Sequence, residues 1–84
     1  MVTILYFARL REALGVASEA LPLPKGVTDL AGVRAIIVAR GEPWSSELAA
    51  TRPVRAAVNQ DMAGDDTPVQ DGDEIAFFPP VTGG

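Results

Sequence analysis

The chain has 84 residues, 48% hydrophobic and 21% charged, which suits one globular domain with a modest core and no large internal cavity. It contains no cysteine and no histidine, which excludes disulfides, thiolate nucleophiles, Cys/His zinc sites and histidine-activated serines. The seven basic residues are scattered and the net charge is −4, so nucleic-acid binding is not expected. A magnesium or calcium site made only of carboxylates stays open, although we predict no metal.

No apolar run approaches the roughly 18–20 residues of a membrane span, and the first residues lack the pattern of a signal peptide. We therefore predict a cytoplasmic protein that enters no membrane. Acidic residues gather in one part of the chain with no base among them: Asp61, Asp65, Asp66, Asp71, Asp73 and Glu74. They are typical of solvated turns, and the alternative is an acidic edge that steers the protein toward a basic partner.

The first quarter of the chain predicts two antiparallel strands joined by a short helix. Residues 2–7 are rich in β-branched and aromatic residues, as in a strand. Alternation places the side chains on two apolar faces, with Val2, Ile4 and Tyr6 on one and Leu5 and Phe7 on the other. Residues 9–14 predict one or two helical turns that end at Gly15. Residues 17–23 predict the second strand, antiparallel because the connection is short.

The main helix is predicted over residues 28–40, with Thr28 or Asp29 as its N-cap. Its apolar stripe at helical spacing is Leu30, Val33 and Ile37. Gly32 is costly inside a helix and would suit close packing on the sheet. Residues 44–48 predict another short turn, in which Trp44 is interpreted as a packing residue.

The second half predicts two more strands, at residues 54–58 and 74–78, separated by turns at 59–60 and 71–72. In the last strand Ile75 and Phe77 share one face, while Ala76 and Phe78 share the other. The order strand, strand, helix, strand, strand predicts an α+β fold, a mixed sheet curled over one main helix. Residues 1–84 form one domain, of which 79–84 are an extended C-terminal tail.

The tail is Pro79–Pro80–Val81–Thr82–Gly83–Gly84. The prolines have restricted φ and should end the strand and fix the direction in which the chain leaves it. The six residues reach at most roughly 20 Å, and the two glycines can thread a channel too narrow for other residues. The alternative is an ordinary frayed terminus.

A terminal carboxylate is ionised at neutral pH and is therefore a poor electrophile. Another protein must first activate it, and we expect an acyl adenylate made with ATP. Attack by a sulfur donor then yields a thiocarboxylate, and attack by a lysine amine yields an isopeptide bond. Because the chain has no cysteine, sulfur that it carries covalently in reactive form would most simply sit at Gly84.

Three segments resemble one known family. The most specific is the C-terminal segment 71–84, DGDEIAFFPPVTGG, and the weaker ones are 7–12, FARLRE, and 57–60, AVNQ. They resemble the small, sulfur-carrying subunits of molybdopterin synthase, and the similarity runs over essentially the whole chain. The resemblance implies a β-grasp, ubiquitin-like fold.

The resemblance also implies a function. An adenylyltransferase related to ubiquitin-activating enzymes would use ATP to adenylate Gly84, next to Gly83, and a thiocarboxylate would follow. The tail would then enter the large subunit of a 2+2 heterotetramer and give its sulfur to cyclic pyranopterin monophosphate, forming the dithiolene of molybdopterin. Two loaded copies are needed per product. The catalytic basic residues belong to the large subunit, so this chain is not catalytic alone and binds no cofactor itself.

The positions that match the family's contacts with the large subunit are Phe7, Met62 and Phe78, followed by the tail residues Pro79, Pro80, Val81 and Thr82. Strand alternation independently places Phe7 and Phe78 opposite the core, where a monomer gains nothing from exposed aromatic residues. The alternative is a second layer of packing. Met62 suits an adaptable contact surface and equally a gap in a core.

Three other functions remain open. A sulfur carrier of thiazole synthesis shares the fold and the Gly–Gly end, but the Phe77–Phe78–Pro79–Pro80 segment favours molybdopterin synthesis. A ubiquitin-like modifier attached to lysines of target proteins is a different class. The last is a binding module with an inert tail.

Overall fold

The computed structural model describes residues 1–49 and 51–80. Its elements are β1 (Val2–Tyr6), α1 (Ala8–Leu14), β2 (Ser18–Leu21), α2 (Leu30–Val38), α3 (Trp44–Glu47), β3 (Arg55–Val58), β4 (Asp61–Ala63) and β5 (Glu74–Phe78). None of the helices in these residues is long and apolar enough to cross a membrane.

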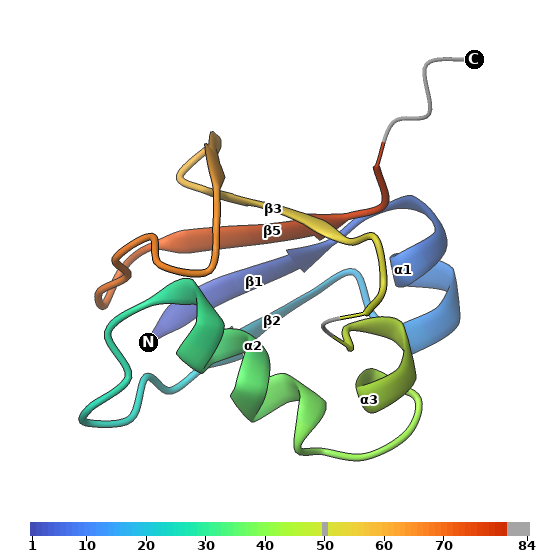
Figure 1. Ribbon diagram of the computed structural model, residues 1–84, viewed down its shortest axis with the longest axis horizontal. Helices are drawn as coiled ribbons and strands as arrows, with labels where there is room; N and C mark the ends of the chain where they lie inside the picture. Colours follow the sequence, from blue (N-terminus) through green and yellow to red (C-terminus); the bar gives the residue numbers. More distant parts are fainter. Residues whose placement is uncertain (50, 81–84) are drawn as a thin grey trace.

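The five strands form one mixed sheet in the order β2-β1-β5-β3-β4. The first and last strands, β1 and β5, run parallel at its centre, and the other neighbours are antiparallel. Figure 1 shows α2 and α3 on the same side of the sheet, with α1 at the end of β1. The predicted α+β, β-grasp arrangement is confirmed, as is the antiparallel pairing of the first two strands.

The core lies between the sheet and the helices. The predicted inward face of β1 is confirmed, because Val2, Ile4 and Tyr6 are at most 1% exposed. They meet the buried face of β5 and the apolar stripe of α2, which comprise Ile75, Phe77, Leu30, Val33 and Ile37. Trp44 is a packing residue, as predicted, with its ring centroid 5.7 Å from that of Tyr6.

The main helix begins and ends close to the predicted residues. Asp29 is its N-cap, and its side chain accepts a hydrogen bond of 2.9 Å from the backbone N–H of Gly32. The regular helix ends at Val38, two residues before the predicted end. A Cβ on Gly32 would lie 2.9 Å from Cγ1 of Val27, so the glycine makes room for the segment before the cap and not for the sheet.

Strand β4 was not predicted. Asn59 and Gln60 have positive φ, 50° and 72°, which fits a tight hairpin turn. The turn pairs Ala57 with Met62 across the hairpin. Residues 61–63 have little β-propensity of their own, so the strand depends on the turn that precedes it.

Candidate functional site: the outer face and the root of the tail

The sheet has a second face that the helices of Figure 1 do not cover. Strand registers place apolar side chains from four strands or their ends on it: Leu5 is opposite Ala76, Ala76 is opposite Ala57, and Ala57 is opposite Met62. Phe7 and Phe78 follow at the ends of β1 and β5. We call this surface the outer face: Leu5, Phe7, Ala57, Met62, Ala76 and Phe78.

The outer face contains the predicted contact residues. Phe7 is 47% exposed and Met62 is 63% exposed, and in the described residues the only other exposed large hydrophobic residue is Met1. Phe78 is half-buried. Exposed apolar residues gathered on one surface are typical of a protein–protein contact. The structure thus brings all three predicted residues to one face, and their role in binding stays a prediction.

Phe7 keeps its place on this face because the strand geometry continues past β1. Its backbone is extended, with φ −119° and ψ 156°, and its N–H donates a 3.1 Å hydrogen bond to the carbonyl of Phe77. Helix α1 begins at the next residue. The chain therefore leaves the sheet beside the end of β5.

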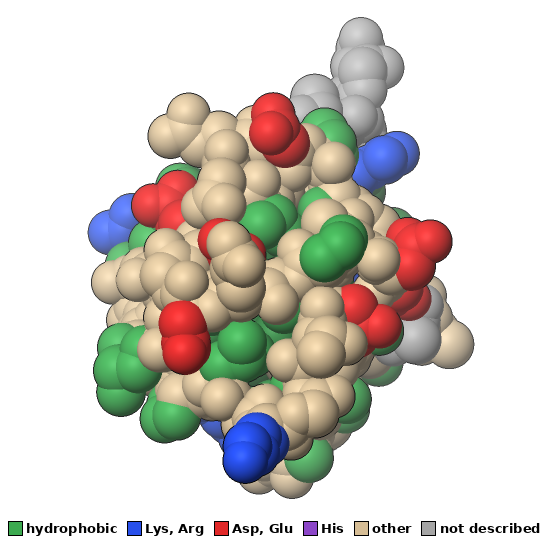
Figure 2. Space-filling view, turned by 90° about the vertical axis from the view of Figure 1, so that its left-hand side faces the viewer, with side chains coloured by type: hydrophobic (Ala, Val, Ile, Leu, Met, Phe, Trp, Pro, Cys, Tyr) green, Lys and Arg blue, Asp and Glu red, His purple; other side chains and the backbone are tan. Residues whose placement is uncertain are grey.

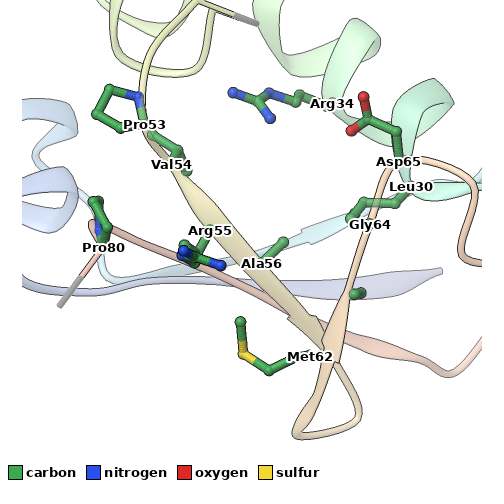
Figure 3. Close-up of a pocket in the computed structure, with 11 residues that line it drawn as sticks. Leu30, Arg34, Pro53, Val54, Arg55, Ala56, Met62, Gly64, Asp65 and Pro80 are labelled. Carbon is green, nitrogen blue, oxygen red and sulfur yellow. The ribbon is translucent and has the colours of Figure 1, made fainter.

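The tail root, Pro79 and Pro80, lies at the same end of the sheet, and both prolines are half-buried. A groove of about 320 Å³ borders Pro80, and its lining includes Arg34, Arg55, Met62 and Asp65. Figure 3 shows these side chains reaching it from α2, β3, β4 and the segment after β4. The predicted residues Val81, Thr82, Gly83 and Gly84 lie outside the described residues.

A second hollow, of about 240 Å³, borders both prolines. One wall is an ion cluster: a Glu47 carboxylate oxygen lies 3.7 Å from Nη2 of Arg9, and the other lies 3.4 Å from Nη2 of Arg52. The Glu47 side chain is 15% exposed. The cluster joins α1, α3 and the segment before β3 beside the tail root. This cluster was not predicted from the sequence, because Arg9 is far from Glu47 and Arg52 in the chain.

Two members of the acidic segment, Asp71 and Asp73, lie in a turn at the other end of the sheet. The Asp71 carboxylate pairs with the N-terminal ammonium at 2.6 Å, and Asp73 accepts hydrogen bonds from Asn59 Nδ2 at 3.0 Å and from the N–H of Gln70 at 2.9 Å. Figure 2 shows acidic side chains spread over the end that contains these turns. For residues 71 and 73, the interpretation as structural turns is therefore favoured. Within the described residues, no group of acidic side chains could hold a metal ion.

A polar network of Tyr6, Glu19 and Arg40 lies on the helix side of the sheet. The Tyr6 hydroxyl donates to Glu19 Oε2 at 2.8 Å, and Arg40 donates to both Glu19 oxygens at 2.8 and 2.6 Å. Burial, and then the hydrogen bond to Glu19, raise the pKa of Tyr6 well above its ordinary value. The hydrogen bond from Arg40 lowers the pKa of Glu19. The network ties β1 and β2 to the end of α2, so its role is structural.

The order of the strands and the helices on one side of the sheet define a small β-grasp protein whose other side carries exposed apolar residues. A model of the ThiS family matches residues 4–84, so the chain belongs to the ThiS family. The molybdopterin synthase sulfur carrier subunit of Escherichia coli is 38% identical over 84 residues, all of both chains. This confirms the family resemblance that residues 71–84 indicate.

Solved structures agree. The putative molybdopterin converting factor subunit 1 of Pyrococcus furiosus is 31% identical, with a TM-score of 0.72 over 95% of this chain and 97% of that one. A complex of subunits 1 and 2 of the molybdopterin-converting factor of Helicobacter pylori contains a chain that is 26% identical, with a TM-score of 0.66 over 99% and 97%. Within the ThiS family, this chain groups with the sulfur carrier subunits of molybdopterin synthase.

Proposed function

We propose that this chain carries sulfur as a thiocarboxylate on Gly84 and donates it to cyclic pyranopterin monophosphate inside a large partner subunit, in the synthesis of molybdopterin. The observation that carries the proposal is the full-length similarity to sulfur carrier subunits. The position of the apolar outer face, beside the root of a tail that reads Gly–Gly, supports it.

Loading takes place on a partner adenylyltransferase. The Gly84 carboxylate attacks the α-phosphorus of ATP, pyrophosphate leaves, and a sulfur donor displaces AMP from the acyl adenylate. Adenylation is needed because the carboxylate itself is a poor electrophile. Gly83 and Gly84 contribute their lack of Cβ, which allows the end of the chain to enter a narrow site.

Delivery uses the outer face. We propose that Phe7, Met62 and Phe78 pack against the large subunit, because covering them removes apolar surface from water. Pro79 and Pro80 direct the tail from the edge of that contact into the partner. Val81 and Thr82 contact the partner along the channel that the tail enters. Each tail carries one sulfur and a dithiolene needs two, so a 2+2 assembly supplies two loaded tails.

The test deletes Gly84. We expect the deletion variant to keep its fold and its affinity for the large subunit but to lose sulfur transfer completely, because the acyl group to be activated is displaced by one residue. Intact mass spectrometry of the full chain from its native host should show a fraction with one oxygen replaced by sulfur, mapped to Gly84. Lys25→Ala, in an exposed turn, is the control and should load normally.

Two outcomes would redirect the proposal. A tail found only in isopeptide conjugates with other proteins would indicate a ubiquitin-like modifier. Loading with sulfur that passes to thiazole synthesis and not to a pterin would indicate the other sulfur carrier. A deletion variant that still supports cofactor production would contradict any role of the terminal carbonyl.

A further inference from the structure

One charged side chain stands beside the apolar outer face. Arg55 begins β3 and is directly opposite Phe78 in the register of β3 and β5, so its side chain leaves the sheet on the same side as Phe78. It is exposed, and with Met62 and Pro80 it lines the groove at the tail root (Figure 3). The guanidinium therefore stands between the predicted contact residues and the tail.

Within the described residues, no carboxylate neutralises Arg55. Three other arginines that line the two hollows have protein partners: Arg9 and Arg52 approach Glu47, and Arg34 donates to the carbonyls of Leu48 and Ala49 at 2.7 and 2.9 Å. Asp65 lines the same groove as Arg55, but no ion pair joins the two side chains.

Docking of a partner would remove water from the Arg55 guanidinium, which costs free energy. A partner that covers Phe78 also removes water from the residue opposite it. An arginine that loses water without gaining an acceptor is strongly destabilising, whereas a planar carboxylate can accept two parallel hydrogen bonds from it. A carboxylate on the partner is therefore the acceptor that best offsets the loss of water at this point.

We propose that Arg55 is a specificity-determining residue that pairs with an acidic side chain on the large subunit, next to the opening that receives the tail. The proposal rests on the proposed function and names the chemistry of the partner surface. At the far end of β5, the charge on this side of the sheet has the opposite sign, because Glu74 alternates with Ala76 and Phe78. A partner surface with the reverse polarity binds in one direction only, which points the tail into the opening.

The experiment measures the Kd between the full chain and the large subunit for a set of variants. Arg55→Glu and Lys25→Glu change the net charge equally, but Lys25 lies in an exposed turn between β2 and α2, remote from the outer face. We expect Arg55→Glu to raise the Kd at least about tenfold more than Lys25→Glu, because like charges would face each other. The excess should shrink as salt is added.

For Arg55→Leu, the direction in which the Kd changes decides whether a partner acid faces Arg55. If a partner acid faces Arg55, leucine leaves that acid without a partner and the Kd rises severalfold, while Arg55→Lys retains most of the affinity. If no acid is there, leucine extends the apolar face and the Kd stays constant or falls, which would overturn the proposal. The thermal unfolding temperature of each variant shows that the fold is kept.

Phe78→Ala separates this inference from the proposed function. Weaker binding by Phe78→Ala together with unchanged or tighter binding by Arg55→Leu would remove the acid pairing and leave the docking face in place. Unchanged binding by Phe78→Ala would remove the outer face as the docking surface, and the role of Arg55 with it.

Discussion

The two faces of the central strand pair are built from the same kind of residue and have different environments. On the inner side, Ile4, Ile75 and Phe77 are completely buried. On the outer side, Leu5, Ala76 and Phe78 are only partly covered. Adjacent residues of one strand, such as Phe77 and Phe78, therefore differ in how completely this chain covers them.

This comparison explains why so small a domain keeps large apolar residues on both sides of its sheet. The inner side, with its helices, supplies the stability of the fold. The outer side is expected to contribute less to the stability of the fold, and exposed apolar area of this kind is typical of a contact with a partner. Substitutions on the two sides should therefore separate stability from binding.

The largest effect is expected for the neighbouring pair Phe77→Ala and Phe78→Ala. Phe77→Ala opens a cavity among Ile4, Tyr6 and the α2 stripe, and should lower the free energy of unfolding by about 3–5 kcal/mol. Phe78→Ala should cost at most about 1 kcal/mol, because its side chain is only half-buried, yet it should weaken large-subunit binding. Urea unfolding followed by Trp44 fluorescence, with a parallel binding measurement, checks both.

The comparison would fail if the two variants lost similar amounts of stability. In that case the outer side would be a second layer of packing, which is the alternative interpretation of its apolar residues. An unfolded Phe77→Ala variant is within expectation, because small domains have only about 5–15 kcal/mol of stability to lose. Phe77→Leu, which retains more of the volume, then gives the comparison on a folded protein.

Much of this arrangement could be predicted from the sequence because strand alternation is a local property. Period-two spacing grouped the side chains of β1 and β5 into the two faces that the structure shows, and the place before an apolar stripe narrowed the N-cap to Thr28 or Asp29, of which Asp29 is the cap. Strand β4 could not be predicted in the same way, because its residues have weak strand propensity. The strand depends on the turn in which Asn59 and Gln60 have positive φ. A hairpin turn should have predicted a strand on each of its sides.

The candidate site was only partly predictable. Phe7 and Phe78 could be assigned to one face by alternation, and the tail by composition. The sequence did not show that Arg55 stands opposite Phe78, since that depends on the register of β3 with β5. The same holds for the network of Glu19 and Arg40, whose members are brought together only by the fold.

Alkaline pH should lower the free energy of unfolding through Tyr6 on the inner side. The expected effect is smaller than that of Phe77→Ala and larger than that of substitutions on the exposed part of the outer face. Burial and the bond to Glu19 raise the pKa of Tyr6 in the folded state, while an unfolded tyrosine ionises near pH ~10. The folded protein holds this proton more tightly, so the stability it contributes is present below that pH and is lost as pH rises toward the folded pKa. Tyr6 is the only tyrosine, so tyrosinate absorbance reports it alone.

We expect tyrosinate to appear only as the protein unfolds, and the free energy of unfolding to fall above pH ~10. Tyr6→Phe should cost about 1 kcal/mol at neutral pH through the lost hydrogen bond, and should reduce the alkaline decline. The contrary result would be tyrosinate absorbance that rises near the ordinary pKa of tyrosine while Trp44 fluorescence shows that the protein is still folded. That result would show that Glu19 does not hold the hydroxyl.

The smallest effect is expected where the outer face is most exposed. Met62 is 63% exposed on a short edge strand, so Met62→Thr removes little buried area and adds a residue that strands favour. The free energy of unfolding should change by less than about 0.5 kcal/mol, while the Kd for the large subunit rises because an apolar contact is replaced by a hydroxyl. Met62→Ile, which also adds a residue that strands favour but keeps the side chain apolar, is the matched control. If Met62→Thr left binding unchanged, the docking surface would end at Phe7 and Phe78 and would not extend across β4.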